Sequence, residues 1–182
     1  MKKIILFTVM AMLCLNFCAK AQSAVKPLLI GDAIPDIALR NVLNYKDSTI
    51  QFSNFKGKAI ILDFWATWCT GCIKGFPQLD GLQKKYADQL QIVLMNISSR
   101  DTKSIISVFL NKQKETIPSF SIPVAMVDIK LKQLFPFHVL PHYIWVSKTG
   151  QIKAITGSEE LNQNNVESLL AGKELNLPLK TN

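Results

Sequence analysis

Apolar residues along the chain gather in short runs, separated by stretches with helical spacing. The run Ala59–Trp65 follows Gly57 and is almost continuously apolar, which is typical of a central strand buried on both faces. Residues 91–97 have the same character. Between the two runs, apolar residues recur every three or four positions from Ile73 to Tyr86, which predicts a helix with one apolar face.

The segments that flank this strand–helix–strand unit have weaker patterns. Residues 37–43 and 49–52 are strand candidates joined by a turn-like segment. A helix is expected over residues 102–114, with Asp101 as a candidate N-cap. Its inner face is assigned to three apolar residues, Ile105, Val108 and Phe109.

The last third of the chain predicts one short strand, one helical turn, a hairpin and a closing helix. Residues 121–127 are the strand candidate and residues 129–134 the helical turn. Residues 142–147 and 151–156 alternate around a Lys-Thr-Gly turn, which predicts an antiparallel hairpin. The closing helix is expected over residues 162–171.

Elements in this order predict an α/β fold with a central mixed sheet and helices on both faces. The composition, 48% hydrophobic and 19% charged, excludes a disordered or low-complexity protein. The length of 182 residues fits one domain. We therefore expect residues 22–182 to form a single domain.

The first 21 residues have the features of a secretory signal peptide. Lys2 and Lys3 precede an apolar segment over residues 4–15, and small residues stand at Ala19 and Ala21. We expect cleavage before Gln22 and export to the periplasm or cell envelope. An uncleaved N-terminal anchor is the alternative, although the apolar segment is short for a bilayer about 30 Å thick. A third interpretation is that Cys18 becomes a lipidated N-terminus, but the bulky residue Phe17 immediately before it argues against lipidation.

Removal of this segment changes the charge and the cysteine count. The net charge falls from +8 to +5, because Lys2, Lys3 and Lys20 leave and 18 basic residues face 13 acidic ones. The basic residues are scattered, without an aromatic-interleaved cluster, so we expect no nucleic-acid partner. Of the four cysteines, only Cys69 and Cys72 remain.

Cys69 and Cys72 are poorly spaced for a structural disulfide and well spaced for redox chemistry. A bridge between them closes almost no loop, whereas a longer loop would constrain the unfolded chain more. The pair stands where a buried strand ends and a helix begins. The unpaired amides and partial positive charge of a helix N-terminus favour a thiolate there, so we expect Cys69 to have a lowered pKa. Cys69 would attack a disulfide, and Cys72 would resolve the mixed disulfide.

Two other readings of the pair stay open from the residues alone. One is a metal site completed by His138 and His142, such as a copper carrier. The 65 residues between Cys72 and His138 do not fit a zinc finger, where the corresponding gap is about 12–15 residues. The other is an inert disulfide. If there is no metal site, His138 and His142 are interpreted as structural residues.

Three further positions are candidates near the pair. Asp63 lies inside the apolar run, where an unpaired carboxyl raises its pKa, and it could exchange a proton with Cys72. The alternative is an Asp63 that faces solvent or bonds a backbone group. Pro141 suits a strand start, which is all that the residues alone indicate. Trp68 is assigned to packing or to the lining of the site.

Together these residues resemble the thioredoxin superfamily and, within it, the exported TlpA/ResA-like thiol-disulfide oxidoreductases. The matching marks are the signal peptide, the phrase FKGKAIILDFWATWCTGC, Pro77 five residues after the second cysteine, and LPHYIWVSKTGQI. The likeness covers most of residues 28–172. It implies a thioredoxin-like fold with an added N-terminal β-hairpin. It also implies a cis peptide between Leu140 and Pro141, with Leu140 offering backbone hydrogen bonds to the partner.

The sequence departs from the family pattern at three places. The spacer is Thr70-Gly71, where relatives usually have proline before the second cysteine, which leaves the direction of electron flow open. Gly75 stands where many ResA-like proteins carry a glutamate. His142 replaces the threonine that is common after the cis proline in thioredoxins.

The resemblance implies an exported thiol-disulfide oxidoreductase, more in keeping with a reductant than with an oxidant. Cys69, Cys72 and Asp63 would be catalytic, and Trp68, Leu140 and Pro141 would contact the substrate. No organic cofactor and no metal are implied. The expected partners are protein disulfides or dithiols, apocytochromes of c-type biogenesis among them, and a membrane thiol donor; the protein is expected to be a monomer. A metal-binding module and a non-catalytic thioredoxin-like binding domain are the rival functions.

Overall fold

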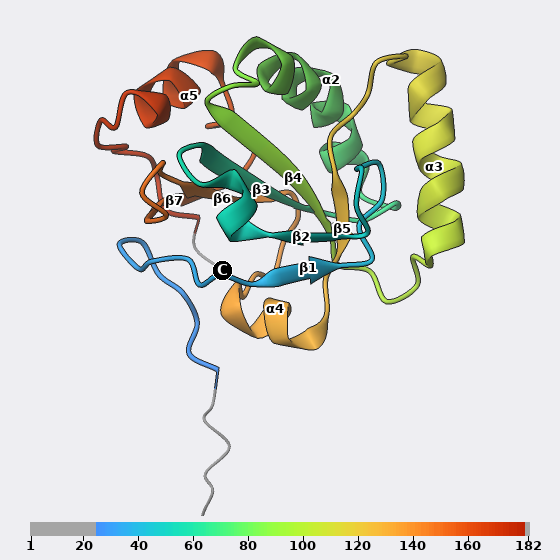
Figure 1. Cartoon of the computed structure of the whole chain (residues 1–182), viewed down its shortest axis with the longest axis horizontal. Coiled ribbons are helices and arrows are strands. Elements are labelled where there is room, and N and C mark those ends of the chain that lie inside the picture. Colours follow the sequence, from blue (N-terminus) through green and yellow to red (C-terminus); the bar gives the residue numbers. More distant parts are fainter. Residues whose placement is uncertain (1–24, 181–182) are drawn as a thin grey trace, which may run out of the picture.

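The computed structural model describes residues 25–180 and contains a central five-stranded sheet (Figure 1). The strand order is β5-β4-β3-β6-β7, where β5 is Val124–Met126, β4 Leu90–Asn96, β3 Ala59–Trp65, β6 His142–Val146 and β7 Ile152–Thr156. β3, β4 and β5 run parallel, and β6 and β7 add antiparallel pairs, so the sheet is mixed as predicted. The predicted signal peptide and its predicted cleavage site lie outside the described residues.

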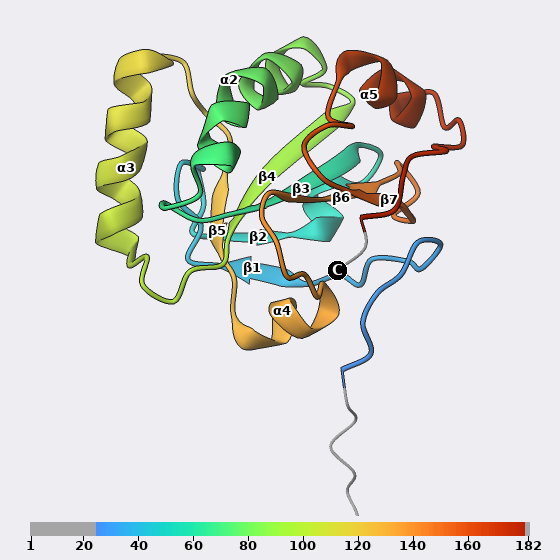
Figure 2. The same cartoon turned by 180° about the vertical axis from the view of Figure 1, so that it is seen from behind.

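Two layers cover the faces of this sheet (Figures 1 and 2). Helices α2 (Thr70–Lys85), α3 (Lys103–Thr116) and α5 (Gln163–Leu170) pack on one face. The other face carries α4 (Ile129–Leu134), the 3-10 turn η1 (Phe52–Phe55) and the hairpin of β1 (Ala38–Arg40) and β2 (Thr49–Gln51). This hairpin is the expected N-terminal addition to a thioredoxin-like fold. None of the helices within residues 25–180 is long and apolar enough to cross a bilayer.

The central strand β3 divides its side chains between the two layers. All seven of its residues are buried. Ile61 and Trp65 pack with the α2 layer, whereas Ile60, Leu62 and Phe64 pack with the hairpin and α4. The nearly continuous apolar run was the correct signal for a strand covered on both faces.

Both outer strands of the sheet are paired on their free side. Leu43, just after β1, exchanges two backbone hydrogen bonds with Val124 of β5, at 2.8 and 3.0 Å. On β7, Ile152 exchanges two backbone hydrogen bonds with residues 31 and 32, and Ile155 accepts one from Lys180. Segments from near both ends of the described chain therefore lie along β7.

Two expectations for α3 were wrong. Its N-cap is Thr102, whose hydroxyl accepts the amide hydrogen of Ile105, because the carboxylate of Asp101 is used elsewhere. Its fully buried residues are Ile106 and Leu110. Ile105 is 45% and Val108 67% exposed, and Phe109 alone of the three predicted residues packs against the core.

Candidate active site

The two cysteines lie at the junction between β3 and α2, and hydrogen bonds from Thr67 to Asp101 hold the turn that joins the two elements. Asp101 accepts hydrogen bonds from the backbone amide of Thr67 at 2.9 Å and from its hydroxyl at 2.7 Å, and one from Asn96 at 2.8 Å. Burial raises the pKa of Asp101, but the hydrogen bonds from Asn96 and Thr67 outweigh it and hold the pKa below its usual value. An ionised Asp101 therefore anchors the turn immediately before Cys69.

Cys69 and Cys72 form a disulfide at the start of α2. Their sulfurs are 2.04 Å apart, and their Cα atoms are 5.3 Å apart. Cys69 is the N-cap residue, and its sulfur accepts the amide hydrogen of Cys72 at 3.2 Å. Cys69 is 7% exposed, whereas Cys72 is completely buried, with its sulfur 4.0 Å from the carbonyl oxygen of Phe64. A partner molecule can therefore reach Cys69 only.

A proline in the cis conformation packs against the spacer between the cysteines. The peptide between Leu140 and Pro141 is cis, as the resemblance implied. A Cβ atom at Gly71 would lie 3.7 Å from Cδ of Pro141, so the first turn of α2 lies against the cis-proline loop. The half-buried Leu140 precedes this proline, and Trp68, 63% exposed, stands beside Cys69. Cys69 thus sits between an exposed indole and the cis-proline loop.

The cis-proline loop is attached to the C-terminal segment by Lys180, which sequence reasoning missed. Its ammonium group donates to the carbonyl oxygens of Val139 and Pro141, each at 2.5 Å. Its backbone amide donates to Ile155 of β7 at 3.0 Å. No sequence pattern signals this contact, because residues 139 and 180 meet only after the chain folds back.

Asp63 is buried on the sheet face that carries α2 and Cys72. It lies between Ile61 and Trp65 on β3, and neither carboxyl oxygen has a hydrogen-bond partner among the described residues. Burial raises its pKa well above the usual value. The alternative of an Asp63 that faces solvent is therefore wrong, and so is one that bonds a backbone group.

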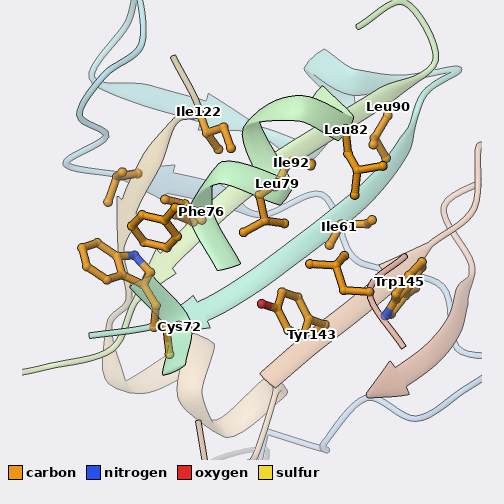
Figure 3. Packing of buried hydrophobic residues seen from close by; sticks show 14 of the residues in the cluster. Ile61, Cys72, Phe76, Leu79, Leu82, Leu90, Ile92, Ile122, Tyr143 and Trp145 are labelled. Carbon is orange, nitrogen blue, oxygen red and sulfur yellow. The ribbon is translucent and has the colours of Figure 1, made fainter. Parts of the chain in front are cut away.

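Tyr143 is a second buried polar group on this face, and sequence reasoning did not select it. It pairs with Asp63 across the β3–β6 register. Its hydroxyl, which has no partner among residues 25–180, would lie 3.5 Å from a Cβ atom at Gly75. Figure 3 shows the hydroxyl pointing toward the start of α2, where Cys72 lies. Burial, and then the charge of Asp63, raises the pKa of Tyr143, so its phenol stays protonated.

The two histidines do not join the cysteines. His142 lies on the opposite face of the sheet, with its ring centroid 5.6 Å from that of Phe64 and 5.4 Å from that of Phe137. Burial, and then the charge of Lys180, lowers the pKa of His142 to about 4. His138 is exposed. Within the described part of the chain, no three His, Cys, Asp or Glu side chains are grouped to hold a metal ion, which removes the support for the copper-carrier reading.

Comparison with known proteins places this geometry among thiol-disulfide proteins. The model of the Redoxin family matches residues 29–170. The chain is 28% identical over 127 residues to the thiol-disulfide oxidoreductase ResA of Oceanobacillus iheyensis, covering 69% of this chain and 64% of that protein. It is 35% identical over 89 residues to the thioredoxin-like protein YneN of Bacillus subtilis, covering 48% and 51%. It is 32% identical over 135 residues to ResA of Bacillus thuringiensis subsp. konkukian, covering 74% and 73%. The chain thus spans about half to two thirds of the length of the first two relatives.

Solved structures agree on the fold. A thiol:disulfide interchange protein DsbE assigned in Chlorobium tepidum matches with a TM-score of 0.61 at 23% identity, over 80% of this chain and 97% of that one. The thioredoxin domain of a thiol-disulfide oxidoreductase from Bacteroides vulgatus matches with a TM-score of 0.62 at 23% identity, over 79% and 99%. At these identities the likeness establishes a thioredoxin-like fold.

Proposed function

Because the chain belongs to the Redoxin family, and within it to the ResA-like thiol-disulfide oxidoreductases of the thioredoxin superfamily, we propose that it exchanges disulfides with partner proteins through Cys69 and Cys72. The observation that carries the proposal is the unequal exposure of the two cysteines of the disulfide: 7% of Cys69 is exposed, whereas Cys72 is completely buried. An inert disulfide needs no such asymmetry, whereas a nucleophile and its resolving thiol do.

In the reducing direction the reaction transfers two electrons to the partner. The Cys69 thiolate attacks one sulfur of the partner's disulfide, and the other sulfur leaves as a thiolate that takes a proton from water. The Cys72 thiol then gives its proton to a base and attacks Cys69. The bond between Cys69 and the partner breaks, and the partner's sulfur leaves as a thiolate that takes up a proton from the base or from water. The partner thus departs as a dithiol, and the disulfide between Cys69 and Cys72 remains. An external dithiol must reduce it for the next cycle.

The start of α2 favours the thiolate form of Cys69. As the N-cap residue, Cys69 lies at the positive end of a 16-residue helix. Its sulfur already accepts the amide hydrogen of Cys72, and a thiolate accepts such a bond more strongly than a thiol. These two effects act on Cys69 and not on Cys72, whose sulfur is enclosed by apolar neighbours.

Asp63 is the base assigned to the second step. Its side chain shares the α2 face with Cys72, and its raised pKa brings its protonation closer to neutral pH, where a proton can be both taken and returned. Asp63→Asn should slow the release of a trapped mixed disulfide. The alkylation of Cys69, which precedes this step, should change much less.

The cellular setting is part of the same proposal. We place the protein in the periplasm or cell envelope, as one domain over residues 22–182 that follows a signal peptide cleaved before Gln22. It would act as a monomeric reductant of protein disulfides, including those of apocytochromes, and would receive electrons from a membrane thiol donor. Trp68, Leu140 and Pro141 would contact the partner.

The pH dependence of alkylation tests the proposal. The reduced protein should react rapidly with one equivalent of iodoacetamide below about pH 8, where a free thiol is mostly protonated. Cys69→Ser should abolish this fast reaction, and the matched variant Cys72→Ser should retain it. If both thiols of the reduced protein titrate like free cysteine, the proposal is wrong.

The reduction potential tests the direction of electron flow. Equilibration of the Cys69–Cys72 couple with glutathione buffers measures it directly. A value near about −270 mV, as in thioredoxin, supports a reductant, whereas a value near about −120 mV, as in DsbA, would make the protein an oxidant.

A further inference from the structure

The disulfide lies at the middle of one edge of the sheet. Strands β5, β4, β3 and β7 all end at this edge, and the antiparallel strand β6 begins there. The loops at this edge therefore follow the strand order. Residues 127–132 and 97–100 lie on the Trp68 side of the cysteines, and residues 139–141 and 157–160 lie on the other.

A continuous groove leads away from the cysteines on the Trp68 side. A hollow of about 300 Å³ is lined by Trp68, Ile97, Arg100 and Lys132, among others. A second hollow of about 420 Å³ shares Ile97, Ser99 and Lys132 with it and reaches Ile129 at the start of α4. We call the two together the basic groove. Trp68 and Ile129, 63% and 77% exposed, supply apolar surface at its two ends.

The basic groove has a positive net charge, because three cations, Arg100, Lys130 and Lys132, line it together with one carboxylate, that of Asp128. Arg100, Lys130 and Lys132 belong to none of the ion pairs among the described residues. Of the two neighbouring acids, only Asp101 is buried, and it is bonded to Thr67 and Asn96. Asp128 is exposed and lines the groove, where one of its oxygens caps α4 by accepting the amide hydrogen of Leu131 at 2.8 Å.

A hollow with the opposite charge lies beyond the cis proline. It measures about 310 Å³ and is lined by Leu140, Pro141, Glu159, Glu160 and Lys180, among others. The ammonium group of Lys180 is engaged by two carbonyl oxygens of the cis-proline loop. Glu159 and Glu160 take part in no ion pair of the described chain. We call this surface the acidic hollow.

We propose that the substrate is a polypeptide segment with charges of opposite sign on the two sides of its reacting cysteine. The segment lies along the sheet edge with its sulfur at Cys69. Its acidic side chain enters the basic groove beyond Trp68, and its basic side chain meets Glu159 and Glu160. This inference rests on the proposed function and adds the charge pattern of the substrate.

Charge-matched peptides test the proposal. Three peptides of equal length carry one cysteine as a mixed disulfide with a chromophoric thiol. One has Glu before the cysteine and Lys after it, one has the reverse order, and one has Gln at both places. A change from attraction to repulsion at one exposed site should slow the reaction with the reduced protein about threefold. The two charged peptides differ in this way at both sites, so their rates should differ about tenfold at low ionic strength. The difference should shrink at 0.5 M salt, where exposed charges are screened.

Charge reversal on the protein identifies the surface responsible. Lys132→Glu should reduce the tenfold difference to about threefold or less, and Glu159→Lys should do the same from the other side. The matched control is Lys148→Glu, an exposed lysine in the β6–β7 turn at the opposite edge of the sheet, which should leave the difference intact.

The outcomes separate this inference from the proposed function. Equal rates for both charged peptides, with the Gln peptide still reduced, would overturn the inference and leave disulfide exchange standing. A difference that Lys132→Glu and Glu159→Lys do not alter would also overturn it. Failure to reduce any of the three peptides would overturn the proposed function, and the inference with it.

Discussion

Replacing Asp63 by Asn should change how the stability of the protein depends on pH. The carboxyl of Asp63 is buried without a partner among the described residues, and its pKa is raised above the usual value of 3.8. In the unfolded chain it ionises near that usual value. Between the two pKa values the native state therefore holds one proton more than the unfolded state, and stability falls as pH rises.

The size of this effect follows from proton linkage. One proton of difference lowers the free energy of unfolding by about 1.4 kcal/mol for each pH unit. Between pH 3.8 and its raised native pKa, the unchanged protein should therefore lose up to about 1.4 kcal/mol per pH unit relative to Asp63→Asn, which has no proton to exchange. The amide of the variant changes the absolute stability by an amount that does not depend on pH, so this offset does not affect the slope.

Urea unfolding of the oxidised proteins at closely spaced pH values measures the slope. The matched control is Asp88→Asn, which removes an exposed carboxylate from the turn after α2 and should leave the slope unchanged. If the curves for Asp63→Asn and the unchanged protein stay parallel from pH 4 to pH 7, Asp63 is not a proton-holding buried acid. The base assigned to the second step would then have to be another group.

Three further predictions concern the surroundings of the site. The pKa of His142 is lowered to about 4 from an ordinary 6.5, so stability is lost as pH falls from 6.5 to 4. Between pH 7 and pH 4.5 His142→Phe should remove about 2 kcal/mol of this loss, measured by unfolding at the two pH values. Gly75→Ala and the control Gly81→Ala should each stabilise the protein by about 0.5–1 kcal/mol, because alanine favours the helix more than glycine. The new methyl group at position 75 lies 3.5 Å from the Tyr143 hydroxyl, an ordinary contact distance, so a loss of thermal stability in Gly75→Ala alone would contradict the prediction. Lys180→Ala should free the cis-proline loop and lower kcat/KM for a protein disulfide several-fold while the alkylation rate of Cys69 stays the same, and Lys180→Arg should restore part of the loss.

The sequence was most informative where the spacing of apolar residues fits only one type of secondary structure. β3, β4 and α2 were predicted close to their observed bounds, because the apolar run and the helical spacing there allow one interpretation. α3 has apolar residues at positions 105, 106, 108, 109 and 110, which surround much of the helix. Periodicity alone could not choose the buried side, and packing selected Ile106 and Leu110.

The residues of the candidate site also separate into those that the sequence predicted and those that it did not. The cysteine pair is a local motif, so the sequence located it, and burial of Asp63 followed from its place in an apolar run. The partners of Asp101, and the approach of Tyr143 to Gly75, depend on contacts between elements far apart in sequence. The carboxylate of Asp101 accepts a hydrogen bond from the Thr67 hydroxyl and does not cap the helix, so Thr102 is the N-cap residue of α3.

The pairing along the outer strands also has a consequence for self-association. An unpaired strand at the rim of a sheet is a template on which other chains can add and aggregate. Here Leu43 occupies part of the rim of β5, while residues 31 and 32 and Lys180 occupy part of the rim of β7. With the proposed function, the protein would meet extended polypeptide segments able to add to such a rim. Shortening the chain at either end would uncover β7 and should favour aggregation over docking at the disulfide.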